Sequence, residues 1–139
     1  MTTRKTTPKP PPKPPPKSSL ITTNIYRDMP EVAWHRTVVD HAMRASWLVY
    51  FIPDAMWRRA FANKTPQALG NRGFPDLVLA HPVRGLKFRE LKRQGGKLSP
   101  YQIIWRDTLL AAGADWALWT PDMLDTHVIP ELWGTRMEP

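Results

Sequence analysis

Three ionisable residues, Asp76, Glu90 and Lys92, lie within two short apolar segments, residues 73–79 and 88–92. Each segment has the composition of a buried strand, where an ionisable side chain is unexpected. Carboxylate oxygens are the ligands that hard divalent cations prefer, and an ammonium group offsets the charge of phosphoryl oxygens. Brought together, these side chains would form a site for a divalent cation and a phosphate.

A turn signal separates the two segments. Residues 82–85 read Pro-Val-Arg-Gly, with Gly85 at the fourth position of the turn. A hairpin about this turn sets Asp76 nearly opposite Glu90, with roughly 4.5–5.5 Å between their Cβ atoms. Lys92 lies two residues beyond Glu90, so the pleat directs it to the same face. The sequence therefore predicts a hairpin over residues 76–92 that gathers the three side chains.

The spacing of apolar residues predicts the elements around this hairpin. A helix should begin within residues 28–31, with Asp28 as an acidic cap and Pro30 in the first turn. Residues 47–52 and 115–119 are expected strands, and a helix should run from a Ser99 cap to a stop at Gly113. A short helix should open at residues 120–122. The predicted fold is α/β, a mixed sheet of about four strands flanked by helices.

The charge is unevenly distributed along the 139 residues. The formal net charge is +8, and residues 1–17 hold five basic residues, seven of the sixteen prolines and no acid. Such a segment cannot bury apolar area, so residues 1–27 are expected to be a disordered basic arm and residues 28–139 the folded domain. A basic balance favours polyanionic partners.

Two absences in the sequence restrict the site and the location. The chain has no cysteine, which excludes disulfides and thiolate metal sites. It has no apolar run of about 20 residues and no apolar leader segment, so neither a membrane span nor a signal peptide is expected. These features favour a cytoplasmic protein.

The pattern Pro-Asp before one strand and Glu-x-Lys on the next resembles that of the PD-(D/E)XK nucleases. The wider context is more specific: GFPDLVL at residues 73–79, ELK at 90–92, GKLSPYQ at 96–102 and AGA at 112–114 occur in order. Together they resemble the VRR-NUC (virus-type replication-repair nuclease) branch over about residues 29–125. The resemblance implies a restriction-endonuclease-like core and a DNA endonuclease that uses Mg²⁺ or Mn²⁺.

The resemblance also implies roles for particular residues. Asp76 and Glu90 match the metal-binding carboxylates, and the peptide carbonyl of Leu91 is a further metal ligand. Lys92 matches the motif lysine, which orients the attacking water or stabilises the phosphoryl group. Members of this branch form homodimers that act on branched DNA such as Holliday junctions. A role in phage or bacterial DNA repair, recombination or replication is therefore expected.

Two further residues match the family pattern but have a second interpretation. Glu31 matches an acidic residue of the first helix, yet it also suits the positive end of the helix dipole. Gln102 matches a polar residue of the following helix, yet it also completes a capping box with Ser99. The chain departs from the family at Ala33, where many members have an acid, and at Phe51, where histidine is common. These departures leave the role of Glu31 open.

DNA contacts are expected from basic residues near the site, which would supply affinity without sequence specificity. They are Lys64, Arg72, Arg93 and Lys97, with Arg58 and Arg59 beside Trp57 and Phe61 as a possible wedge at a strand junction. The four histidines form no recognisable ligand pair.

Three other interpretations remain open at this stage. Asp76 and Glu90 could be surface partners of Lys92, Arg89 or Lys87, each pair contributing no more than about 1 kcal/mol. The chain could be a non-catalytic nucleic-acid-binding module that keeps the site as a scaffold. It could also be a sequence-specific, restriction-type nuclease.

Overall fold

The computed structural model describes residues 24–52 and 70–134. The predicted arm up to residue 23, and the cationic residues Arg58, Arg59 and Lys64, lie outside these ranges. Residues 24–27 were predicted to end the arm, but they form a turn on the folded domain. The Asn24 side chain donates a hydrogen bond to the Asp122 carbonyl at 2.8 Å, and Tyr26 packs against the core. The folded region therefore starts earlier than the predicted boundary at residue 28.

A single four-stranded sheet organises the described residues. Its strands are β1 (Leu48–Phe51), β2 (Leu77–His81), β3 (Gly85–Leu91) and β4 (Asp115–Trp119), in that spatial order. Strands β1, β2 and β3 are antiparallel neighbours, whereas β3 and β4 are parallel. The predicted mixed α/β sheet is confirmed.

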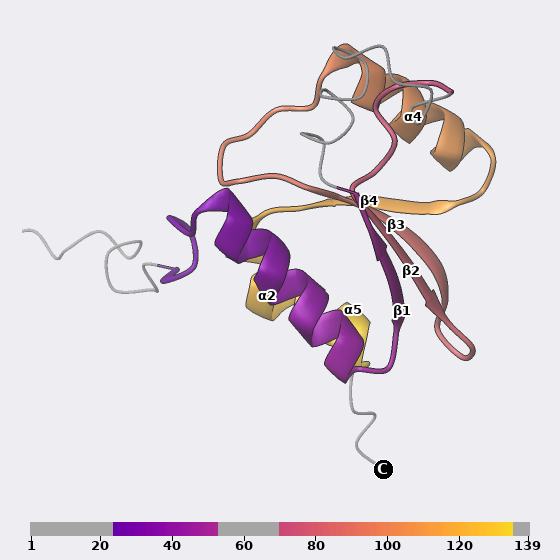
Figure 1. Ribbon diagram of the computed structural model, residues 1–139. Helices are drawn as coiled ribbons and strands as arrows, with labels where there is room; N and C mark the ends of the chain where they lie inside the picture. Colours follow the sequence, from indigo (N-terminus) through magenta and orange to yellow (C-terminus); the bar gives the residue numbers. More distant parts are fainter. Residues whose placement is uncertain (1–23, 53–69, 135–139) are drawn as a thin grey trace, which may run out of the picture.

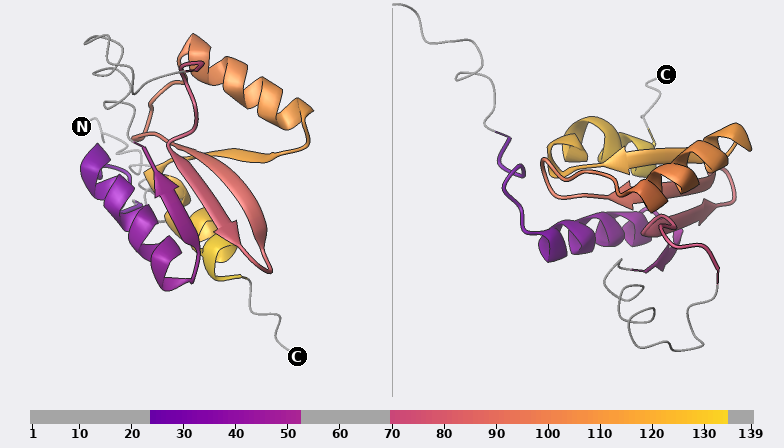
Figure 2. Two further views of the ribbon diagram at one scale, coloured as in Figure 1. Left: turned by 45° about the vertical axis from the view of Figure 1, so that its right-hand side comes forward. Right: turned by 90° about the horizontal axis from the view of Figure 1, so that it is seen from above.

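Helices cover both faces of this sheet. Helix α2 (Glu31–Arg44) and the short α5 (Ile129–Trp133) lie on one side, and α4 (Pro100–Ala111) lies on the other (Figures 1 and 2). The predicted C-terminal helix is a longer irregular segment. It passes through a 3₁₀ turn, η1 (Pro121–Met123), and a π-helical turn, η2 (Leu124–Val128), before α5.

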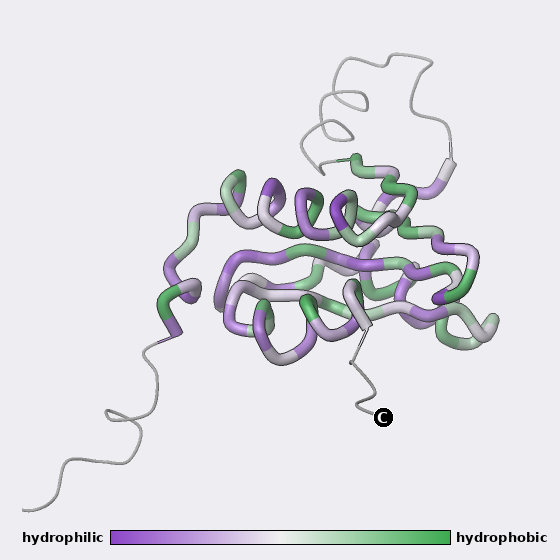
Figure 3. The backbone as a smooth tube through the Cα atoms, turned by 90° about the horizontal axis from the view of Figure 1, so that it is seen from below, coloured by the Kyte–Doolittle hydropathy of each residue, from purple (hydrophilic) through white to green (hydrophobic). Residues whose placement is uncertain are grey.

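The core lies between the sheet and the α2/α5 layer. Trp34, Trp47 and Trp119 are each at most 4% exposed. The Trp34 indole N–H donates to the Trp119 carbonyl at 3.3 Å, and that of Trp47 donates to the Leu132 carbonyl at 2.8 Å. Buried indoles need such partners. Hydrophilic and hydrophobic residues alternate along the helices (Figure 3), as expected for helices with one buried face.

The two predicted helix starts have different outcomes. Helix α4 begins with the predicted capping box, because Ser99 Oγ accepts the Gln102 N–H and Gln102 Oε1 accepts the Ser99 N–H. Asp28 does not cap α2, so that prediction is wrong. Residue 28 belongs to the preceding turn, and extended Pro30 is the N-cap without a side-chain hydrogen bond.

The predicted hairpin is present. Leu77 faces Arg89 at one end of the β2–β3 ladder, and His81 faces Gly85 at the other. Gly85 has φ +88°, a value that glycine adopts without strain. The His81 ring accepts the N–H groups of Val83 and Arg84, which closes the turn. This register determines which side chains meet at the open end of the hairpin.

Candidate active site

The open end of the hairpin places two carboxylates side by side. Asp76 directly precedes β2, and the ladder continues it opposite Glu90 of β3. Asp76 is 4% exposed and Glu90 is 2% exposed. One Asp76 oxygen accepts the Leu91 N–H at 2.9 Å. The structure thus brings the two predicted acids together in a buried position.

Burial makes the charged form of Asp76 unfavourable. Desolvation raises its pKa above the usual 3.8. The Leu91 N–H, a hydrogen bond with Glu90 and the nearby His35 and Lys92 lower the pKa, but less strongly. Two carboxyl groups share a hydrogen bond only when a proton lies between them. Burial therefore disfavours ionisation of Asp76, and a cation bound beside it would favour the ionised form.

Lys92 supplies the cation that was expected at this site. Its Nζ lies 3.7 Å from Glu90 Oε1, and its side chain is 20% exposed. Lys92 thus places an ammonium group beside the carboxylate pair. The Lys92 side chain also lines a small pocket with Gln102, so it is accessible to a ligand.

Gln102 combines the two interpretations that the sequence left open. Its Oε1 accepts the Ser99 N–H as part of the capping box, while its Nε2 donates to Glu90 Oε1 at 2.7 Å. The side chain is 4% exposed. The cap therefore fixes the amide so that its donor faces Glu90.

The Leu91 carbonyl is directed toward the same edge. In an extended strand, the N–H and C=O of one residue point to the same side. The Leu91 N–H donates to Asp76, and the next N–H, that of Lys92, donates to Trp119 on the opposite side. The Leu91 carbonyl therefore points toward Asp76, as a metal ligand there would.

Helix α2 contributes a histidine that the sequence analysis missed. The charge of His35 lowers the pKa of Asp76, and its ring lies 5.1 Å from that of Phe51. Glu31, one turn earlier, is 63% exposed and lies 3.9 Å from His35 Nε2. Glu31 therefore lies beside His35, and no direct contact of Glu31 with Asp76 or Glu90 is seen among the described residues. Two signals in the sequence could have indicated His35. It follows Glu31 by four residues, about one helical turn, and Phe51 stands at the position where histidine is common.

The opposite face of β3 holds a separate charge cluster. Arg89 forms ion pairs of 2.8 Å with Asp115 and Glu131, and Lys87 pairs with Asp115 at the same distance. Because successive side chains alternate between faces, these cations lie away from Glu90. The interpretation of Asp76 and Glu90 as partners of Arg89 or Lys87 is therefore excluded.

The other predicted DNA contacts lie at different places. The Arg72 guanidinium stands 5.2 Å above the Tyr101 ring, in the pocket that also contains Lys92. Arg93 lines a different pocket with Arg27 and Glu31. Lys97 is exposed in the loop before α4. Of Arg72, Arg93 and Lys97, Arg72 is the one that shares a pocket with Lys92 and Gln102.

The donor set fits a hard divalent cation that keeps much of its water. Within residues 24–52 and 70–134, no three His, Cys, Asp or Glu side chains form a ready-made metal cluster. Two buried carboxylates and a backbone carbonyl remain, a set poor in nitrogen and sulfur. Mg²⁺ is held in this way, by one or two carboxylates with several waters.

A family model agrees with this geometry. The VRR-NUC domain model matches residues 20–120, most of the chain and all of the elements that carry the site. The chain belongs to the VRR-NUC family. A solved VRR-NUC domain structure is 16% identical, with a TM-score of 0.51, and the match covers 70% of this chain and 96% of that domain. At this identity the likeness shows the fold alone. Among curated proteins, none matches significantly.

Membership of the VRR-NUC family implies a nuclease-type function with DNA as substrate. The PD-(D/E)XK-like core predicted from the sequence agrees with the observed sheet and its flanking helices. Across the part of the chain that the structure describes, no helix has the length and apolar character needed to cross a bilayer.

Proposed function

We propose that this VRR-NUC protein is a DNA endonuclease that depends on Mg²⁺ or Mn²⁺ and hydrolyses phosphodiester bonds at the Asp76–Glu90 pair. The observation that carries the proposal is the buried pairing of these two carboxylates. Both are at most 4% exposed, burial raises the pKa of Asp76, and the Lys92 ammonium group lies 3.7 Å from Glu90 Oε1. A divalent cation bound here would favour the ionised carboxylates that burial disfavours.

Asp76, Glu90 and the Leu91 carbonyl would hold the cation, which supplies Lewis-acid activation of the phosphodiester when bound. No ligand from the opposite face of β3 is needed. Asp76 stays in position because the Leu91 N–H fixes one of its oxygens. Glu90 stays in position because the Gln102 side-chain amide donates a hydrogen bond to one of its oxygens.

Lys92 has a role in the reaction itself. Its ammonium group reaches the pocket beside the carboxylates and can orient the attacking water or stabilise the phosphoryl oxygens as their charge grows. Such a donor acts most strongly in a water-poor site, where charges are poorly screened. Gln102 is a positioning residue, because its amide acts through Glu90.

We further propose that the enzyme is a homodimer that cleaves branched DNA, such as Holliday junctions, in phage or bacterial DNA repair, recombination or replication. Family resemblance and the basic composition support this substrate class. Light scattering of the purified protein tests the dimer.

The decisive experiment compares two lysines of one segment. Linear, flap, splayed and four-way DNA are incubated with Mg²⁺, Mn²⁺ or EDTA, using wild-type protein, Lys92→Ala and Lys87→Ala. We expect metal-dependent cleavage, mainly of branched DNA, that Lys92→Ala lowers by at least about a hundred-fold. Lys87→Ala, on the other face of β3, should stay active.

Three other results would contradict this proposal, and two of them would identify another function. Full cleavage by pure Lys92→Ala contradicts the assigned chemistry. DNA binding without cleavage in any divalent metal indicates a binding module. Cuts at one short recurring sequence on plain plasmid DNA indicate a restriction-type nuclease.

A further inference from the structure

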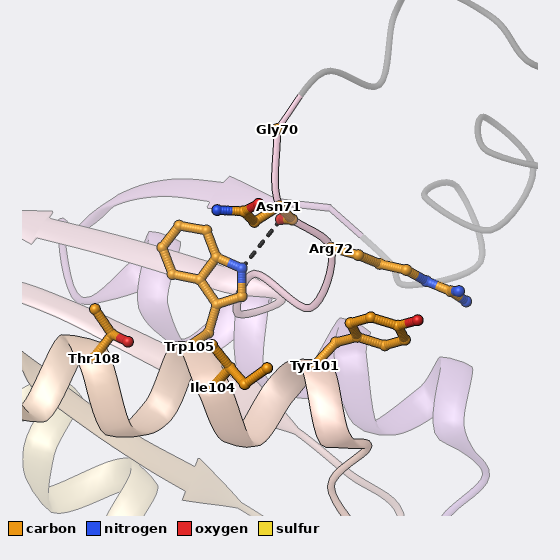
Figure 4. A pocket seen from close by; sticks show the side chains of 7 residues that line it. All are labelled: Gly70, Asn71, Arg72, Tyr101, Ile104, Trp105 and Thr108. Atoms are coloured by element: carbon orange, nitrogen blue, oxygen red, sulfur yellow. Dashed lines mark hydrogen bonds between the residues drawn. The ribbon is translucent and has the colours of Figure 1, made fainter.

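A second pocket lies beside the small pocket that contains Lys92 and Gln102. It has a volume of about 640 Å³ and lies between the loop of residues 70–72 and the outer side of α4 (Figure 4). The smaller pocket that contains Lys92 and Gln102 has a volume of about 240 Å³ and shares Arg72 and Tyr101 with it. The two pockets together form a continuous trough, which leads from the proposed chemistry to an aromatic surface.

Backbone contact preforms this trough. Gly73 has φ +93°, and a Cβ there would lie 2.4 Å from the Tyr101 carbonyl carbon, so the loop rests directly on the first turn of α4. The Trp105 indole donates to the Asn71 carbonyl at 3.1 Å, and its ring lies 5.0 Å from that of Phe74. These contacts fix Trp105 and place Arg72 beside Tyr101.

The exposed groups of the trough match the chemistry of a nucleotide. Tyr101 is 50% exposed and Ile104 is 63% exposed, which leaves flat apolar surface open to a ligand. Arg72 and Lys92 line the trough, and among the described residues no carboxylate lines either pocket. Aromatic rings stack on bases, and arginine both stacks on aromatic faces and binds phosphate with two donors. An apolar peptide would leave both cations unused.

We propose that this trough binds one unpaired nucleotide of the DNA next to the scissile phosphate. The base lies against Tyr101 and Trp105, and Arg72 contacts the flanking phosphate. A paired base has both faces covered by its neighbours in the duplex, so only an unpaired or extruded base can enter. This inference rests on the proposed nuclease function, and it defines the substrate as DNA with a single-stranded nucleotide at the cut.

The two tyrosines of similar exposure provide a matched test. Tyr101 is 50% exposed in the trough, and Tyr50 is 61% exposed on β1, outside both pockets. Both lie on the surface, so replacing either should leave the fold intact. The variants are Tyr101→Ala, Tyr101→Phe and Tyr50→Ala, and Arg72→Gln tests the phosphate contact.

Binding is measured in EDTA by fluorescence anisotropy, with a blunt duplex and with the same duplex carrying a single-stranded overhang. We expect Tyr101→Ala to weaken binding of the overhang DNA roughly ten-fold or more and to leave blunt-duplex binding unchanged. Tyr101→Phe and Tyr50→Ala should bind as wild type. Arg72→Gln should weaken binding and lower its salt dependence. An unpaired 2-aminopurine should be quenched by wild type but not by Tyr101→Ala.

Two results would overturn the proposal. One is that Tyr101→Ala affects both DNAs equally or neither. The other is that it changes the molecular mass measured by light scattering without changing DNA preference, which would show that the trough is a contact between copies of the chain. Failure of the nuclease function looks different. In that case no DNA is cleaved, whereas the overhang preference and its loss in Tyr101→Ala persist.

Discussion

On one face of β3, Arg89 is 1% exposed and forms ion pairs with two carboxylates, Asp115 and Glu131. Lys87 forms a further ion pair with Asp115. On the other face, one residue along, Glu90 is 2% exposed and lies beside a second carboxylate, Asp76, with Lys92 as the cation. In the first cluster, hydrogen bonds and charges from Arg89 and Lys87 lower the pKa of Asp115, whereas in the second, burial raises the pKa of Asp76. A carboxylate that is stabilised in its ionised form favours the fold. A buried carboxylate whose ionisation is disfavoured suits a bound cation, at the expense of stability.

The largest difference between the faces should appear in activity. Glu90→Gln removes a proposed cation ligand, and we expect cleavage of branched DNA to fall about a thousand-fold. Glu131→Gln neutralises an acid on the opposite face and should keep nearly full activity. Single-turnover cleavage in Mg²⁺ measures both variants. Equal losses in the two variants would show that the faces do not divide chemistry from stability.

The next largest difference should appear in folding. Arg89→Met leaves Asp115 and Glu131 without their buried cation, so we expect the free energy of unfolding to fall by about 3 kcal/mol. Lys92→Met should cost less than about 1 kcal/mol, because Lys92 is partly exposed and solvent screens its charge. Urea denaturation measures both. A greater loss in Lys92→Met than in Arg89→Met would reverse the assignment.

The smallest effect has the opposite sign. Burial raises the pKa of Asp76, so its ionisation costs stability, and that cost grows as pH rises above 3.8. Asp76→Asn should therefore raise the stability of the metal-free protein at neutral pH by about 1 kcal/mol while abolishing cleavage. Thermal melting in EDTA measures the gain, which should shrink as the pH falls toward 3.8.

Asp115 serves as the control for this pH dependence. Desolvation raises its pKa, but hydrogen bonds from Arg89 and Lys87 and their charges outweigh that effect and lower it overall. Its stabilisation is thus present above pH 3.8 and is lost as pH falls through the lowered pKa. Asp115→Asn should destabilise the protein at neutral pH, and this penalty should disappear in acid. A gain of stability in Asp115→Asn, or a loss in Asp76→Asn, would contradict the comparison.

The sequence was sufficient to predict the hairpin because its register depends on local features. The turn at residues 82–85 and the apolar pattern of both strands fix which residues face each other, and Asp76 and Glu90 follow from that. The capping box of α4 is equally local. The start of helix α2 at Glu31 lies within the predicted range, but its cap was wrongly assigned to Asp28, because the turn at residues 24–28 forms through contacts with distant residues such as Asp122.

The remaining features depend on how elements pack. His35 approaches Asp76 only because α2 lies against β1 with a particular rotation, which apolar spacing does not specify. The trough depends on backbone contact between Gly73 and α4, and the motif GFPD contains no sign of the helix that it touches. Gln102 was recognised, but its simultaneous contact with Ser99 and Glu90 required the position of β3.

The contact of Gly73 with α4 has a consequence for the products of the reaction. Main chain rests on main chain there, so the separation between the backbone that carries Tyr101 and the loop that leads into Asp76 does not depend on side-chain packing between them. If a flipped base occupies one end of the trough while the phosphodiester bond breaks at the other end, the fold keeps the distance between the base and the cut constant. Fragments should then end at a constant offset from the single-strand boundary, whatever the nucleotide sequence.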